Sequence, residues 1–117
     1  MISYRSLHEQ SLLRFASEVS AATIAVECTK AEIILVAGGD DAIWPSDTFA
    51  KSIAARLASY AKHASLVFNQ EAGHRVLFPG EKTPRSALHA HGGNDRADAA
   101  LGEAAWKVMT ECLDLPP

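Results

Sequence analysis

The sequence predicts an α/β fold, with a small parallel sheet of two strands flanked by about three helices. Two short runs of branched and aromatic apolar residues, within 32–37 and 65–69, indicate the strands. A stretch with helical spacing lies between them, and a strand–helix–strand connection pairs its strands in parallel. Because 117 residues is the length of one domain, we expect residues 1–117 to form a single domain.

The first half of the chain is predicted to contain a helix, the first strand and a second helix. Residues 4–20 carry apolar side chains at a spacing that favours a helix over a strand: Leu7, Leu12, Leu13, Phe15 and Val19. Residues 32–37 are closed by two glycines, as expected for a buried parallel strand. After Pro45, the side chain of Ser46 or Asp47 is expected to cap a helix with the apolar stripe Phe49, Ile53, Leu57 and Tyr60.

The second half is predicted to hold the second strand, a long loop and a last helix. Residues 65–69 form the strand, and residues 72–95 are rich in Gly, Pro and His without a sustained period. A structureless stretch of this length in a small domain is usually functional. Residues 98–115 contain a helical row of apolar residues that ends at two prolines.

A sheet of two strands has two open edges and little area. Either the chain contains strands that its pattern does not reveal, or another chain supplies them. We expect self-association to complete the sheet, with a dimer that joins two small sheets into one.

Composition narrows the classes of function. The net charge is −3 and the 11 basic residues are scattered, which disfavours a nucleic acid partner. No apolar run approaches the ~20 residues that a membrane span needs, and the first residues lack the apolar segment of a signal peptide. Cys28 and Cys112 are expected to be buried thiols in a reducing compartment, so the predicted location is the cytoplasm.

Asp41 and His74 are the residues whose placement best suits chemistry. Each follows a predicted strand, and parallel strands ~4.8 Å apart release their loops at the same edge of the sheet. A carboxylate that holds the Nδ1–H of an imidazole is the orienting half of a nucleophile–His–Asp triad. The local pattern leaves open whether Asp41 only caps the next helix, and whether its neighbour Asp40 takes its place.

The chain offers no nucleophile for such a triad. It contains no Gly-x-Ser-x-Gly elbow, Ser46 is expected to be engaged as a helix cap, and nothing nearby would activate Cys28. His89 and His91 could suggest a metal, but a flexible His-x-His matches no tight ligand spacing. We therefore expect neither a metal nor a cofactor.

Two motifs resemble those of a known family: Gly38-Gly39-Asp40-Asp41-Ala42-Ile43-Trp44-Pro45-Ser46 and Glu71-Ala72-Gly73-His74. With them the chain resembles the C-terminal part of an α/β-hydrolase. It is similar to the acyl-CoA thioester hydrolase and bile-acid-CoA:amino-acid N-acyltransferase group, which is related to dienelactone hydrolase. The resemblance extends to Gly92-Gly93 and Trp106. It implies that Asp41 is the triad acid, that His74 is the base, and that the loop after His74 shapes an acyl or CoA pocket.

The resemblance also implies that this chain holds roughly the last third of a catalytic domain, with the nucleophile and the oxyanion hole upstream. The expected function is that of the C-terminal fragment of an acyl-CoA thioesterase or acyltransferase of the serine-hydrolase type. Its substrate would be an acyl-CoA or another ester or thioester, and the fragment would be inactive alone. The alternative is a non-catalytic interaction module that homodimerises through its sheet edges. Hydrolysis and acyl transfer, and a Ser or a Cys nucleophile, all remain open at this point.

Overall fold

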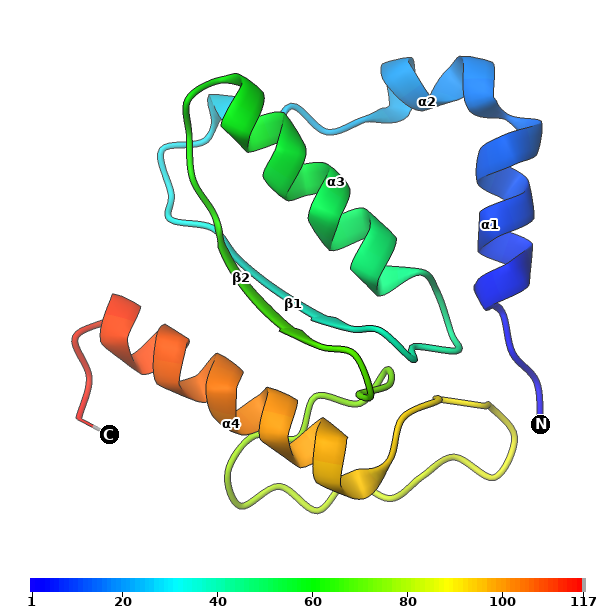
Figure 1. Cartoon of the computed structure of the whole chain (residues 1–117), viewed down its shortest axis with the longest axis vertical. Helices are drawn as coiled ribbons and strands as arrows, with labels where there is room; N and C mark the ends of the chain where they lie inside the picture. Colours follow the sequence, from blue (N-terminus) through cyan, green and yellow to red (C-terminus); the bar gives the residue numbers. More distant parts are fainter. Residues whose placement is uncertain (117) are drawn as a thin grey trace.

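In the computed structural model, which describes residues 1–116, a two-stranded parallel sheet lies between two helices (Figure 1). The strands β1 (Ile34–Gly38) and β2 (Ser65–Asn69) pair in register, with Gly38 opposite Asn69. Helix α3 (Ser46–Ser59) connects them on one face of the sheet, and α4 (Asp95–Cys112) covers the other. The predicted parallel pair with its crossover helix is therefore confirmed.

The hydrophobic core lies between the sheet and α4. Alternate side chains of a strand point to opposite faces. Val67 of β2 is buried in a cluster with Ala72, Ala97, Leu101 and Ala105. On the other face, Phe68 lies beneath the Lys51 ammonium of α3, which is 4.8 Å from the ring centroid. Burial of a leucine contributes ~1.5–3 kcal/mol, so Leu101, the largest buried side chain of this cluster, is a main contact between α4 and the sheet.

The N-terminal region differs from the single helix predicted over residues 4–20. It forms two helices, α1 (Arg5–Arg14) and α2 (Ala16–Ala22), and neither contains a buried residue. Phe15 separates them and leaves the helical region, with φ −108° and ψ 31°. An apolar stripe without a fully buried residue gives little reason for one continuous helix, because most helical stability in proteins comes from packing. Residues 1–116 therefore form four α-helices rather than about three.

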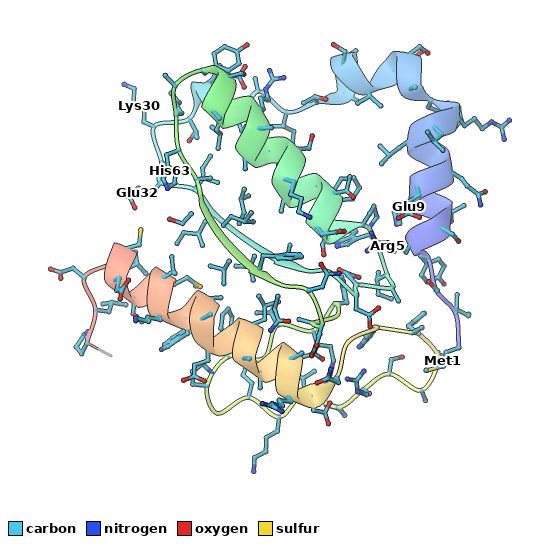
Figure 2. The ribbon with its side chains drawn as sticks, viewed as in Figure 1. Met1, Arg5, Glu9, Lys30, Glu32 and His63 are labelled. Atoms are coloured by element: carbon cyan, nitrogen blue, oxygen red, sulfur yellow. The ribbon has the colours of Figure 1, made fainter. Side chains whose placement is uncertain are left out.

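Arg5 attaches α1 to the rest of the molecule. Its guanidinium lies 3.0 Å from the Asp47 carboxylate at the start of α3 and 3.1 Å from the carbonyl oxygen of Asp41. It also pairs with Glu9 on the next turn of α1, 2.8 Å away (Figure 2). Farther along, the short 3-10 helix η1 (Val26–Cys28) leads into β1. It is tied to α3 by the ion pair of Glu27 with Arg56 at 2.6 Å.

The predicted side-chain cap of α3 is absent. The helix begins at Ser46, but the Ser46 hydroxyl donates to the carbonyl oxygen of Gly38 at 3.3 Å, and Asp47 is engaged by Arg5. In contrast, α4 begins at Asp95 rather than at Asp98 and is capped by Asn94, whose side chain accepts from the Ala97 N–H at 2.9 Å.

The prediction of two buried thiols is wrong, since Cys28 and Cys112 are both exposed. The Cys112 thiol donates to the Glu32 carboxylate at 3.0 Å, and this hydrogen bond raises the pKa of the thiol. Among residues 1–116, no helix combines the length and apolar character that a membrane crossing requires.

Candidate active site

Asp41 and His74 lie side by side at the carboxyl ends of the two strands. His74 Nδ1 is 3.1 Å from Asp41 Oδ2. Asp41 follows the end of β1 at Gly38, and His74 follows the end of β2 at Asn69. Because the strands are parallel, both loops leave the same edge of the sheet. The structure thus brings together the two residues that the sequence singled out.

The Asp41 carboxylate is buried, with an exposed fraction of only 2%, and both of its oxygens are engaged. Oδ1 accepts from the backbone N–H groups of Ile43 and Trp44 at 2.9 and 3.2 Å, which closes a turn before α3. Oδ2 faces His74. Since an ionised carboxylate only accepts hydrogen bonds, Nδ1 of a neutral His74 carries the proton and Nε2 keeps a free lone pair.

His74 is held on several sides but stays accessible. Its backbone N–H donates to the carbonyl oxygen of His91 at 2.8 Å. The Trp44 ring meets the imidazole edge-on, with centroids 5.5 Å apart and planes at 76°. The His74 side chain is nevertheless 33% exposed. Its ring forms no second hydrogen bond with the residues that the structure describes, so a reactant can approach it from outside.

Asp40, the alternative acid, turns to a different partner. Its Oδ2 accepts from the Gly93 N–H at 2.8 Å, and its own N–H donates to the Ala72 carbonyl oxygen at 2.9 Å. It therefore joins the loop after β1 to the loop before α4. Of the two neighbouring acids, only Asp41 meets the histidine.

Gly92 and Gly93 allow the long loop to reach the site. Both have φ near +65°, a conformation that side chains with a Cβ rarely adopt. A Cβ on Gly92 would collide with the carbonyl oxygen of Asp40, and one on Gly93 would collide with the backbone N of Gly73. Close backbone contact at these two positions is what brings the His91 carbonyl beside His74.

An ion network that the sequence did not reveal follows His74, with Arg75 and Asp98 buried at its centre and Asp95 and Arg85 exposed. The guanidinium of Arg75 contacts the carboxylates of Asp98 at 3.1 Å and Asp95 at 2.5 Å, and Arg85 contacts Asp95 at 3.2 Å. The hydrogen bond from Arg75 is the main cause that lowers the pKa of Asp95. One signal was available in the sequence: an arginine directly follows His74, and two acids lie three residues apart where the last helix begins.

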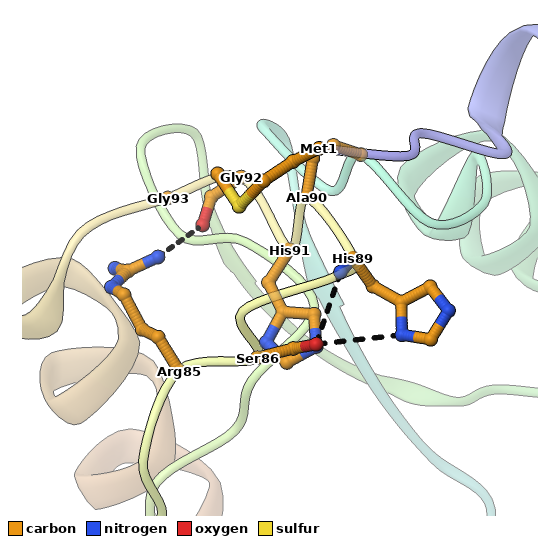
Figure 3. A pocket seen from close by; sticks show the side chains of 9 residues that line it. Met1, Arg85, Ser86, His89, Ala90, His91, Gly92 and Gly93 are labelled. Carbon is orange, nitrogen blue, oxygen red and sulfur yellow. Dashed lines mark hydrogen bonds between the residues drawn. The ribbon is translucent and has the colours of Figure 1, made fainter.

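A cavity of about 260 Å³ lies beside the loop that carries His91 (Figure 3). It is lined by Met1, Ala42 and residues 85, 86 and 89–93. The His91 ring lines it and lies with its centroid 6.0 Å from that of His74. His91 Nδ1 is buried and has no hydrogen-bond partner among residues 1–116. Burial, followed by nearby positive charge, lowers the pKa of His91.

His89 and His91 of the same loop are the residues that could suggest a metal. Within residues 1–116, no group of three or more His, Cys, Asp or Glu side chains is placed to hold a metal ion. His89 Nδ1 lies 3.4 Å from the Ser86 hydroxyl instead. No serine hydroxyl or cysteine thiol of the described residues hydrogen-bonds to His74, so within residues 1–116 the imidazole is paired with a carboxylate but has no hydroxyl or thiol against it.

Comparison with known proteins agrees with the motifs around Asp41 and His74. Residues 6–114 match the family described as "BAAT / Acyl-CoA thioester hydrolase C terminal". No curated protein gave a significant match. Because the match covers nearly the whole sequence, the chain belongs to the BAAT/acyl-CoA thioester hydrolase C-terminal family.

Proposed function

We propose that His74 and Asp41 are the base and the acid of a catalytic triad whose nucleophile lies outside these 117 residues. The observation that carries the proposal is the 3.1 Å contact between His74 Nδ1 and a buried Asp41 carboxylate, with the imidazole left partly exposed. Membership of the family supports an acyl-CoA, or a related ester or thioester, as the substrate.

The chemistry follows from the two side chains. His74 Nε2 takes the proton from a hydroxyl or thiol as that group attacks the thioester carbonyl. Asp41 stabilises the resulting imidazolium, which then gives the proton to the departing thiolate. The acyl group, now bound to the nucleophile, passes to water in a hydrolase or to an amine in a transferase, with His74 again acting as the base.

The proposal includes a larger fold. β1 and β2 would be the last two strands of an α/β-hydrolase sheet, and the open edge of β1 supports the addition of further strands. The cavity lined by the loop before α4 would form part of the acyl or CoA pocket, and its position beside His91 and His74 supports that use. A cytoplasmic location is supported by the two unpaired cysteines.

The first test is an assay of the purified chain with acyl-CoA thioesters, in which the released thiol is followed. We expect no turnover, because no nucleophile contacts His74 in residues 1–116. Turnover that is lost in His74→Ala would place the nucleophile inside the chain and contradict the proposal. The coding sequence upstream of Met1 gives a second test, since the proposal expects a Gly-x-Ser-x-Gly or Gly-x-Cys-x-Gly elbow there.

The surface favours one further candidate, a non-catalytic module that pairs with a second copy. The outer edges of β1 and β2 carry no strand partner among the described residues. Leu66 and Phe68 of β2 are 42% and 36% exposed. An apolar groove of about 820 Å³ also separates α2 from α3, lined by residues that include Val19, Ile24, Phe49 and Ile53. Light scattering at micromolar concentration tests this candidate: it requires a dimer, and a strict monomer would contradict it.

A further inference from the structure

Asp98, on the first turn of α4, contacts the residues on both sides of His74. Its carboxylate is fully buried, with an exposed fraction of 0%. Oδ1 accepts from the N–H of Gly73 at 2.8 Å. Oδ2 accepts from Arg75, with 3.2 Å to Nε and 3.1 Å to Nη2. One side chain therefore contacts the residue before the histidine and the residue after it.

The contact continues beyond the carboxylate. The N–H of Leu77 donates to the backbone carbonyl oxygen of Asp98 at 3.4 Å. Arg75 is itself tied to the far part of the loop, because its Nη1 donates to the carbonyl oxygen of Thr83 at 2.7 Å. The loop that carries His74 is thus bound to α4 at alternate residues, 73, 75 and 77, while the core holds α4 on the sheet.

Burial of the Asp98 carboxylate costs free energy, which these contacts offset together with the guanidinium of Arg85, 3.5 Å from Oδ2. A buried carboxylate loses its hydration and is tolerated when its lone pairs are bonded and an opposite charge is near. The Arg75 side chain is only 6% exposed, so the charge pair is shielded from water. Such a pair favours one geometry, because a group that turned away would leave its partner buried with fewer bonds.

We propose that Asp98 is a positioning residue for His74: by holding Gly73 and Arg75, it sets the imidazole against Asp41 and keeps the proton on Nδ1. This inference rests on the proposed function of the Asp41–His74 pair and extends it to a side chain that touches neither Asp41 nor the imidazole. Without Asp98, the histidine loop would shift on the sheet edge, and the ring would lose its preference for the Nδ1–H form.

The test is the ¹⁵N spectrum of the His74 ring in the full chain, which distinguishes the Nδ1–H from the Nε2–H form. Asp98→Asn keeps the shape of the side chain but removes the charge that pairs with Arg75. We expect the wild-type ring to be in the Nδ1–H form, and Asp98→Asn to lose that preference. An unchanged ring spectrum in Asp98→Asn would overturn the inference.

Asp95→Asn is the matched control. Asp95 lies on the same turn of α4 and also contacts Arg75, but its side chain is 80% exposed and it forms no bond to Gly73. We expect this variant to keep the Nδ1–H form. An equal loss in both variants would show that any weakening of Arg75 suffices, and it would overturn the assignment to Asp98.

Two further measurements keep the outcomes separate. In Asp41→Asn the amide can present N–H to the ring, so the Nε2–H form is expected; a ring that does not respond refutes the proposed pair and this inference with it. If Asp41→Asn changes the tautomer of the ring and Asp98→Asn does not, the proposed Asp41–His74 pair is supported and the positioning role of Asp98 is refuted. If Asp98→Asn does not fold, the contact itself is measured in the wild-type chain. The observable is the scalar coupling between the Gly73 amide nitrogen and the Asp98 carboxyl carbon, and its absence would refute the inference.

Discussion

A single buried carboxylate accounts for much of the site geometry at the scale of residues. Asp41 bonds the backbone of the turn that follows it and the ring of His74 at the same time. The two interpretations that the sequence left open, a local cap and a partner for the histidine, are therefore both present in one side chain. The local pattern could not separate Asp41 from Asp40, because that choice depends on a contact with Gly93, 53 residues away from Asp40.

An ion pair far from the site makes the stability depend on pH. The hydrogen bond from Arg56 lowers the pKa of Glu27 to about 2 from its ordinary 4.5. A carboxylate with a lowered pKa in the folded state stabilises fully above pH 4.5 and loses this contribution as the pH falls toward 2. Wild type should thus be more stable than Glu27→Gln above pH 4.5, with a difference that shrinks below it.

Urea unfolding at a series of pH values measures this difference. Glu103→Gln, which removes an exposed carboxylate of α4 that forms no ion pair within residues 1–116, controls for net charge. A difference between wild type and Glu27→Gln that stays constant from neutral pH down to about pH 2 would contradict the assigned pair.

At the scale of elements, the sequence located both strands and the two long helices within a few residues but misplaced the caps. Ser46 has the right residue type and position for a cap of α3, yet its hydroxyl donates to the carbonyl oxygen of Gly38. Asn94 caps α4, in a segment that the sequence indicated only as part of a long loop. A cap depends on backbone angles at the first residue of the helix, which residue types alone do not determine.

The two positions give a direct comparison. Asn94→Ala should lower the free energy of unfolding by ~0.5–2 kcal/mol, because the N–H of Ala97 loses its acceptor. Ser46→Ala should cost less, since no N–H of α3 depends on its side chain. Chemical denaturation of both variants tests this order, and a larger loss in Ser46→Ala would show that Ser46 caps α3 in solution.

The shape of the long loop between β2 and α4 could not be predicted from the sequence either. Its shape comes from pairs far apart in the chain, such as Arg75 with Asp98, and not from any local period. The sequence showed that the segment lacks regular structure, which the structure confirms between β2 and α4. Which side chains meet across it could be read only once α4 was placed on the sheet.

At the scale of the whole molecule, the chain has one well-packed half and one loosely attached arm. The sheet and α4 share the buried cluster, whereas α1 and α2 bury no residue and stand to one side (Figure 1). The helical spacing of this arm was predictable from the sequence, but the absence of buried residues in it was not. An apolar stripe does not reveal what packs against it.

Amide hydrogen exchange should report this division. Amides of α1 and α2 are expected to exchange orders of magnitude faster than those of α4 around Leu101, since local opening there exposes no buried surface. Equal protection of the arm and α4 would contradict the expectation. It would also indicate that a further polypeptide or a second copy covers the groove between α2 and α3.

A kinetic comparison tests the proposed role of Asp41 toward His74 most directly. The comparison uses this chain joined to the polypeptide proposed to supply the nucleophile. There, Asp41→Asn should lower kcat for thioester turnover by ~10⁴-fold, because the ring then holds its proton on the wrong nitrogen. Asp40→Asn changes the neighbouring acid, keeps an oxygen that accepts from Gly93, and should stay within a few-fold of wild type. Full activity in Asp41→Asn, or a loss in Asp40→Asn as large as the one in Asp41→Asn, would contradict the claim that Asp41 orients His74.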